Sequence, residues 1–192
     1  MEKFKGLYRI ESARMQGWNY GWAGLYFITI CTKDRVCWFG EMVNHKLSLS
    51  DIGTIVEMEW RNTFEMRPDM NLYMGEFVIM PNHFHAIIGI GTNRYNIQYD
   101  DHRRDAMHCV STHHCVSNTP PKTTISSQSN NLASIVRGFK ASVTKQARML
   151  HVDFAWQSRY YDHIIRDEKS FHAISTYIIN NPAQWAKDEL YL

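Results

Sequence analysis

Neither sign of charge predominates in this sequence. Its 192 residues contain 21 Lys and Arg against 19 Asp and Glu, which gives a formal net charge of +2 at pH 7. This balance excludes an overall basic coat for duplex DNA, so a nucleic-acid site has to come from local clusters of basic side chains. Hydrophobic residues make up 44% of the chain, which indicates one globular domain over residues 1–192.

Cysteines, long apolar runs and internal repeats are scarce. Four cysteines without a C-x-x-C pair do not fit a secreted disulfide scaffold. The first 20 residues contain no apolar segment typical of a signal peptide. The longest apolar run, residues 77–91, is interrupted by Pro81 and Asn82 and is too short to span a bilayer. We therefore expect a cytoplasmic protein that has no membrane partner and is not a solenoid.

Hydrophobic periodicity predicts elements in the order β, α, β, β, α, β, α. We expect strands at residues 24–33, 71–80, 83–90 and 161–165, and helices at residues 52–67, 132–150 and 168–181. Residues 38–49 favour a short strand or hairpin, and Asp51 and Asp167 are the expected helix caps. This order predicts an α+β sandwich, an antiparallel sheet with helices on one face.

Residues 92–131 lose this periodicity and are rich in Ser, Thr and Asn. We expect a long polar surface loop or insertion there. The segment contains a cluster of potential zinc ligands, namely His108, Cys109, His113, His114 and Cys115. Because Cys-x5-Cys is not a usual zinc spacing, we do not expect a structural zinc in it.

The sharpest chemical feature is His83-Phe84-His85 at the start of an apolar run. Alternate side chains of a strand point to the same face, so both imidazoles can reach one divalent cation. Phe84 then points into the core. A pair of hydrogen-bonded structural histidines would have the same sequence, and a metal site needs at least one further ligand.

The last predicted helix offers such a ligand and a nucleophile. Tyr177 and Asn181 are spaced i, i+4, which places them on one helical face. Pro182 disfavours helical geometry at the residue before it, so Asn180 is a rival to Asn181. Tyr177 as a packing residue, and Asn-Asn-Pro as a plain helix stop, also remain open.

Two segments in this order, MPNHFHAIIGI and WQSRYYDHIIRDEKSFHAISTYIINNP, resemble the REP-associated tyrosine transposases, a branch of the HUH single-tyrosine transposases. YFITICTKDR and LASIVRGFKASVTKQAR also look like that family, so the resemblance covers most of the chain from about residue 20, apart from 92–131. It implies a ferredoxin- or RRM-like HUH fold.

The resemblance also implies residue roles. His83 and His85 match the metal-binding pair, Asn181 the auxiliary metal ligand, and Tyr177 the catalytic nucleophile. The implied cofactor is Mg²⁺ or Mn²⁺, and the implied partner is single-stranded or hairpin DNA. Attack by Tyr177 on a phosphodiester would give a 5′-phosphotyrosine and a free 3′-hydroxyl. From chemistry alone, Tyr160 and Tyr161 remain rival nucleophiles.

Candidate DNA-binding residues lie in two segments. Arg137, Lys140 and Arg148 form a polar stripe opposite the apolar face of their helix, which suits phosphates but is also typical of a solvated helix. Trp156 and Arg159 place an aromatic ring near a basic group, which suits stacked bases, although Trp156 is equally expected in the core.

We therefore expect a transposase or single-strand endonuclease that cleaves and rejoins DNA. The alternative is a DNA-binding module that recognises repeat hairpins without cutting them. An H-x-H metallohydrolase on a β/α barrel is excluded because the chain lacks the repeated βα pattern. A homodimer is compatible with the sequence, which does not determine the oligomeric state.

Overall fold

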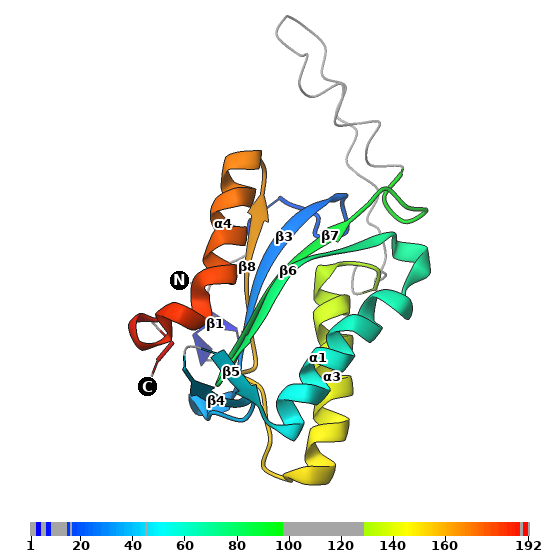
Figure 1. Ribbon diagram of the computed structural model, residues 1–192. Helices are drawn as coiled ribbons and strands as arrows, with labels where there is room; N and C mark the ends of the chain where they lie inside the picture. Colours follow the sequence, from blue (N-terminus) through cyan, green and yellow to red (C-terminus); the bar gives the residue numbers. More distant parts are fainter. Residues whose placement is uncertain are drawn as a thin grey trace, which may run out of the picture.

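The protein is built on a four-stranded antiparallel sheet with helices packed on it (Figure 1). The computed structural model describes residues 3–4, 7–8, 15, 17–44, 46–97, 129–188 and 190–191. The strands are β3 (Gly24–Cys31), β6 (Leu72–Met80), β7 (His83–Ile90) and β8 (Tyr161–Ile165), in the spatial order β6-β7-β3-β8. The predicted α+β class and antiparallel sheet are confirmed.

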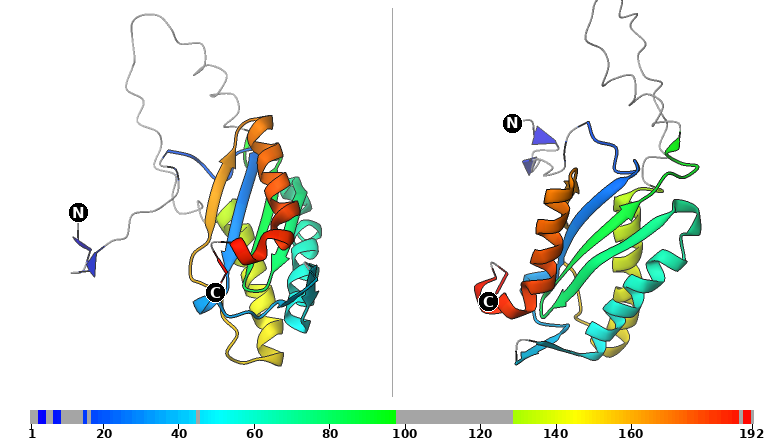
Figure 2. Two further views of the ribbon diagram at one scale, coloured as in Figure 1. Left: turned by 60° about the vertical axis from the view of Figure 1, so that its left-hand side comes forward. Right: turned by 45° about the horizontal axis from the view of Figure 1, so that its top comes forward.

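Helices cover both faces of this sheet, so the prediction that all of them lie on one face is wrong. α1 (Asp51–Glu65) and α3 (Leu132–Leu150) pack on one face, and α4 (Glu168–Asn180) packs on the other (Figures 1 and 2). The two central strands β3 and β7 are buried along most of their length. Continuous apolar strands of this kind require cover on both faces.

Alternation along the strands divides the apolar side chains between two clusters. Phe84, Ala86 and Ile88 of β7 join the larger cluster under α1 and α3, whereas Ile87 joins a smaller cluster under α4. The predicted inward side chains of α4, Phe171, Ile174 and Ile178, belong to this smaller cluster. The predicted apolar face of α3 is buried except at its last member, Leu150, which is half exposed.

Polar side chains close the first turns of the helices. Ser50, one residue before the predicted cap Asp51, is the N-cap of α1, because its side chain accepts a hydrogen bond from the Gly53 amide at 3.0 Å. Asp167 caps α4 as predicted and accepts from the Ser170 amide at 2.7 Å. Each cap satisfies an amide that the helix itself leaves without a partner.

Short elements complete the described fold. The expected hairpin within residues 38–49 is present as the pair of β4 (Gly40–Val43) and β5 (Lys46–Leu49). The other short elements are β1 (Lys3–Phe4), β2 (Leu7–Tyr8) and the 3₁₀ turns η1 (Lys33–Arg35), η2 (Pro68–Met70) and η4 (Asn181–Lys187). None of the described helices combines the length and the apolar character that a membrane crossing requires.

Most of the expected insertion, residues 98–128, lies outside the described residues, and so does the cluster that contains His108 and Cys115. The described start of this segment is packed against the domain. Asn93 and Asn96 are buried, and the Asn96 side chain donates to the carbonyls of Gly21 and Gly91 at 3.1 and 3.0 Å. Residues 93–96, at the start of the predicted loop, therefore pack against the folded domain.

Candidate active site

The histidine pair lies at the beginning of β7, on the sheet face that α4 covers. β6 and β7 pair antiparallel across the two-residue turn Pro81-Asn82, and β7 starts at His83. His83 and His85 share the α4 face, and Phe84 between them lies in the core under α1 and α3. Both imidazoles are almost completely buried. The predicted alternation is therefore present.

Hydrogen bonds orient both imidazoles. The Asn82 amide nitrogen donates to the Leu190 carbonyl at 2.9 Å, so its side-chain oxygen, 2.8 Å from His83 Nδ1, acts as an acceptor. His83 Nδ1 must then carry the proton, which leaves the Nε2 lone pair available. Thr29 Oγ1, on the neighbouring strand, lies 2.8 Å from His85 Nδ1. Contacts of this kind to Nδ1 typically orient metal-binding histidines.

Both histidines are neutral at physiological pH. Burial, with a smaller contribution from the positive charge of Arg35, lowers the pKa of His83 to about 3. Burial also lowers the pKa of His85 to about 3, with a smaller contribution from His83, while Asp188 acts in the opposite direction. Neutral imidazole is the form that binds a metal ion, so protons do not compete for these nitrogens near pH 7.

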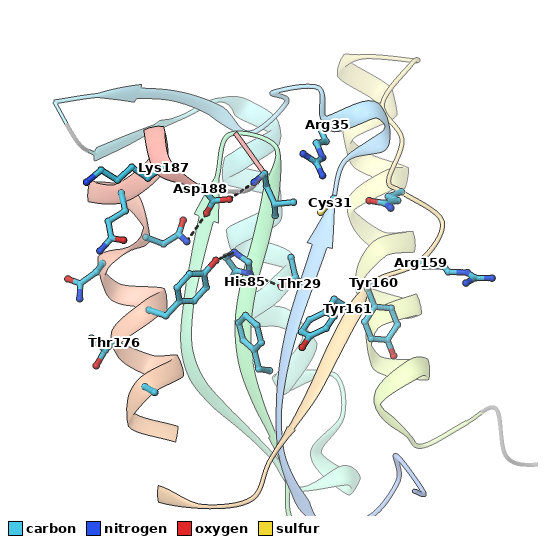
Figure 3. A pocket seen from close by; sticks show the side chains of 18 residues that line it. Thr29, Cys31, Arg35, His85, Arg159, Tyr160, Tyr161, Thr176, Lys187 and Asp188 are labelled. Atoms are coloured by element: carbon cyan, nitrogen blue, oxygen red, sulfur yellow. Dashed lines mark hydrogen bonds between the residues drawn. The ribbon is translucent and has the colours of Figure 1, made fainter. Parts of the chain in front are cut away.

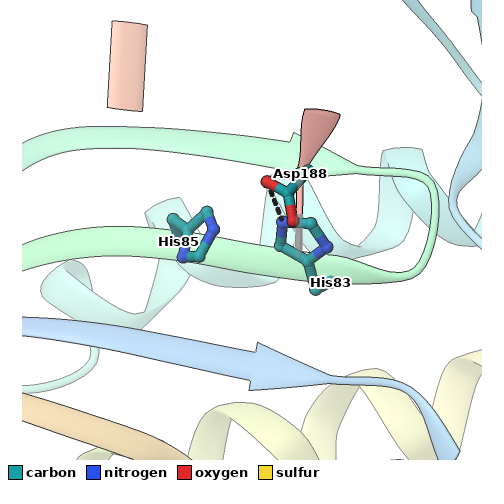
Figure 4. Close-up of side chains that lie close together, drawn as sticks. All are labelled: His83, His85 and Asp188. Atoms are coloured by element: carbon teal, nitrogen blue, oxygen red, sulfur yellow. Dashed lines mark ion pairs between the residues drawn. The ribbon is translucent and has the colours of Figure 1, made fainter. Parts of the chain in front are cut away.

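A carboxylate that the sequence reasoning missed completes a cluster of potential ligands. Ligand atoms of His83, His85 and Asp188 all lie within 4.8 Å of one another, and Asp188 Oδ2 lies 3.9 Å from His83 Nε2 (Figure 4). Asp188 follows η4, and its place beside β7 depends on the path of the chain after α4. No local sequence signal distinguishes it from any other acidic residue.

Asn181, the predicted auxiliary ligand, lies in the same cluster. Its Nδ2 donates to Asp188 Oδ2 at 3.0 Å. Asn181 is the buried C-cap of α4 and keeps right-handed helical dihedrals despite Pro182, whereas its rival Asn180 is exposed. Asn181 Oδ1 and His83 Nε2 are buried and have no hydrogen-bond partner among the residues that the structure describes. Two unsatisfied lone pairs beside a carboxylate fit a divalent cation.

Tyr177 reaches this cluster from α4. Its hydroxyl lies 3.2 Å from His85 Nε2, and its ring makes an edge contact with Phe27 at a centroid distance of 6.2 Å. The residue is 45% exposed, and its hydroxyl lies next to the buried ligands. This combination is what a nucleophile that attacks a bound polymer requires.

The cluster opens into a cleft of about 1060 Å³ between α4, the sheet and the segment that leads into β8 (Figure 3). Tyr160 and Tyr161, the rival nucleophiles, line this cleft on the side of β8, and Tyr161 makes an edge contact with Phe27 at 6.3 Å. Arg159 lines the same cleft.

The other predicted DNA-binding residues lie elsewhere. Lys140, Arg148 and Trp156 line a second hollow of about 660 Å³ beside α3, and Gln157 lines both hollows. Arg137 is exposed on α3 and lines neither of these two hollows.

Several of these side chains also have a structural role. Lys140 Nζ donates to the Gln157 carbonyl at 2.6 Å, and Arg148 Nε donates to the Phe154 carbonyl at 3.1 Å. The half-buried Trp156 ring packs 5.4 Å from Phe154, so it contributes to the core. These contacts fasten the segment after α3 onto that helix.

Comparison with solved structures identifies the class of this fold. The structure of the REP-associated tyrosine transposase bound to a REP hairpin matches over 94% of this chain and 77% of that chain, with a TM-score of 0.55 and 16% sequence identity. The chain thus has the fold of the REP-associated tyrosine transposases, as the sequence resemblance implied. A second structure, of a Deinococcus radiodurans R1 protein, matches at a TM-score of only 0.39 with 12% identity, over 87% of this chain and 97% of that chain.

A relative in sequence defines the family. A Haemophilus influenzae (strain Rd) protein, described as an uncharacterized protein, is 39% identical over 193 residues, which cover 97% of this chain and 96% of its own length. The chain belongs to the same family as this protein. No family model matches the chain.

Proposed function

We propose that the protein is a DNA transposase, or a single-strand endonuclease, that cleaves and rejoins single-stranded or hairpin DNA through Tyr177. One observation carries the proposal: the Tyr177 hydroxyl lies 3.2 Å from His85 Nε2, at the edge of the cluster formed with His83 and Asp188. The fold supports this proposal, because the chain shares its fold with a transposase whose structure was solved bound to a hairpin.

The proposed ligands of a divalent cation are His83, His85, Asn181 and Asp188, with Mg²⁺ or Mn²⁺ as the ion. Their donor set of neutral imidazoles, an amide oxygen and a carboxylate suits either ion. When bound, the cation would neutralise charge that develops on the phosphate and favour ionisation of a nearby hydroxyl.

Tyr177 supplies the nucleophile. Its Oη forms a bond to phosphorus, and the bond from phosphorus to the 3′ oxygen breaks. The phenolic proton passes to water, because the low pKa of His85 makes that imidazole a poor base. The departing 3′ oxygen takes a proton from water. The product is a 5′-phosphotyrosine, which another 3′-hydroxyl can attack in the reverse step to rejoin strands and release Tyr177.

The proposed DNA surface comprises the cleft and the hollow beside α3, with Arg159 in the first and Lys140, Arg148 and Trp156 in the second. Gln157 lines both, which gives a bound strand a continuous path from one to the other. Arg137 extends the basic face of α3. Contacts to phosphates hold the DNA without regard to sequence.

The test is covalent trapping. A labelled single-stranded hairpin incubated with the protein and Mn²⁺ is expected to give a covalent adduct on a denaturing gel. Tyr177→Phe should abolish the adduct, because it removes only the attacking oxygen. Tyr160→Phe and Tyr161→Phe serve as controls and should still form it. An adduct that persists in Tyr177→Phe contradicts the proposal, and hairpin binding without any adduct favours the non-cleaving module.

A further inference from the structure

The loop that follows β3 places a basic side chain at one end of the cleft. Cys31, the last residue of β3, pairs with His83 in the sheet, so the loop starts directly beside the first histidine of the pair. Arg35 lines the same cleft as Tyr177. Figure 3 shows Arg35 at the end of the cleft where Cys31 and Asp188 also lie.

The backbone of this loop is held in an unusual conformation. Asp34 and Arg35 have φ of 53° and 55°, a left-handed conformation that residues with a side chain adopt only at a cost in free energy. The loop is fixed by Thr32, whose hydroxyl lies within hydrogen-bond distance of the carbonyls of Val36 (2.8 Å) and Asn82 (3.0 Å). The backbone of Arg35 is therefore already ordered before a ligand binds, so binding has to order only its side chain.

The charges that line the cleft suit a polyanion. Among the described lining residues, Arg35, Arg159 and Lys187 are basic and Asp188 is acidic. In Figure 3, Arg159 and Lys187 lie at opposite sides of the cleft, and Arg35 lies at the end where Asp188 and Lys187 also lie. A guanidinium presents donors in a planar fork that matches two phosphate oxygens, which a lysine ammonium cannot reproduce.

We propose that Arg35 binds a phosphate of the bound DNA strand, within one nucleotide of the bond that Tyr177 attacks. The assignment rests on the proposed function, because it needs a nucleic acid in the cleft. It explains why a strained, rigid loop begins beside His83, since a phosphate at the ligand cluster has to be held in register with the tyrosine.

The variant Arg35→Asn tests this contact. Asn tolerates left-handed dihedrals, so the loop should keep its conformation while the guanidinium is lost. Binding is measured by fluorescence anisotropy with a labelled hairpin that has single-stranded flanks, in a Tyr177→Phe background that prevents cleavage. We expect affinity to fall about 10- to 100-fold, as for the loss of charge-assisted hydrogen bonds. Arg35→Lys should recover only part of this loss.

The matched control is Lys33→Ala in the same loop. Lys33 is exposed and does not line the cleft. The hydrogen bond that its backbone N–H donates to the Ala155 carbonyl is kept in the variant. It removes the same charge, so its effect on binding should be a few-fold at most and should disappear at higher salt. An equal loss in both variants would overturn the specific role of Arg35.

Neutral phosphates identify the contact directly. Methylphosphonates are placed one at a time along the single-stranded flank of the hairpin. At the contacted phosphate, neutralisation should weaken binding by the protein that keeps Arg35 and leave binding by the Arg35→Asn variant almost unchanged. At every other phosphate, both proteins should lose the same affinity. Equal responses at every position would overturn the proposal.

The two proposals fail separately. If the protein binds the hairpin but forms no adduct, cleavage by Tyr177 is wrong, while the methylphosphonate series still decides whether Arg35 binds a phosphate. If the adduct forms and Arg35→Asn binds and reacts at the original rate, only the Arg35 proposal is wrong. A protein that does not bind the hairpin at all overturns both.

Discussion

At the scale of single residues, the candidate site depends on which lone pairs are left unused. Asn82 and Thr29 each contact the Nδ1 atom of one histidine, at 2.8 Å. The other atoms that could bind a metal ion lie close together: ligand atoms of His83, His85 and Asp188 are within 4.8 Å of one another. A buried polar atom without a partner costs free energy, so a ligand that binds these atoms should stabilise the folded protein.

Asp188→Asn tests the carboxylate at this site. The substitution keeps the shape and an oxygen that can accept from Asn181, but it removes the negative charge that attracts a cation. We expect the affinity for Mn²⁺, measured by isothermal titration calorimetry, to fall at least about tenfold. The control is Glu168→Gln, an exposed carboxylate in the first turn of α4, which should bind Mn²⁺ normally. Unchanged affinity in Asp188→Asn would remove Asp188 from the ligand set.

At the scale of elements, close backbone contacts determine where the helices lie. Gly53, in the first turn of α1, has no side chain because a Cβ atom would lie 2.1 Å from the Phe39 carbonyl oxygen. At Gly138, in α3, the nearest atom to a Cβ would be Nη2 of Arg67, the end of a flexible side chain, at 2.3 Å. The same substitution thus meets rigid backbone at one helix and a movable group at the other.

Gly53→Ala should consequently destabilise the protein, whereas Gly138→Ala should not. Alanine in a helix interior gains about 1 kcal/mol of intrinsic propensity over glycine. At Gly53 the overlap with the Phe39 carbonyl should outweigh this gain and lower the free energy of unfolding by about 1–3 kcal/mol. At Gly138 the free energy of unfolding should stay the same or rise. Urea denaturation of both variants measures the difference, and a stabilised Gly53→Ala would show that α1 is free to shift.

α4 and η4 together form the element that assembles the chemistry. The i, i+4 spacing brings Tyr177 and Asn181 to one face of α4. The 3₁₀ turn that follows returns the chain, so that Asp188 Oδ2 accepts a hydrogen bond from Asn181 Nδ2 at 3.0 Å. Pro182 is accommodated in the first turn of η4, where its missing amide hydrogen is not needed. A helix that simply stopped before Pro182 would leave the ligand cluster without its carboxylate.

At the scale of the whole molecule, the two buried histidines couple folding to pH. Their pKa is about 3 in the folded protein, against an ordinary value near 6.5 in the unfolded chain. The unfolded state therefore binds more protons below pH 6.5, so their contribution to stability is complete above that pH and is lost as the pH falls toward 3.

We expect the free energy of unfolding of the metal-free protein to decrease between pH 7 and pH 5, by up to about 1.4 kcal/mol per pH unit for each histidine. Urea denaturation in the presence of a chelator measures the slope, and the double variant His83→Gln/His85→Gln should have a much smaller one. A slope that is unchanged in this variant would assign the pH dependence to other groups.

Much of this protein is determined by its sequence alone. Period-2 and period-3.6 patterns located the strands of the main sheet and the three long helices, because such patterns report which side of a segment is buried. The H-x-H spacing placed both imidazoles on one face, and the i, i+4 spacing did the same for Tyr177 and Asn181. These are short-range properties, fixed by the geometry of one strand or one helix.

Only the tertiary structure decided the remaining features. α4 packs on the sheet face opposite α1 and α3, and this brings Tyr177 to His85. Asp188 and Arg35 reach the site through turns whose course depends on contacts with residues distant in the sequence. One such contact is the hydrogen bond from the Asn82 side chain to the Leu190 carbonyl. A local pattern states that a face is buried but not what buries it, so the choice between the two faces of the sheet, and with it the assembly of the site, is made when the chain packs.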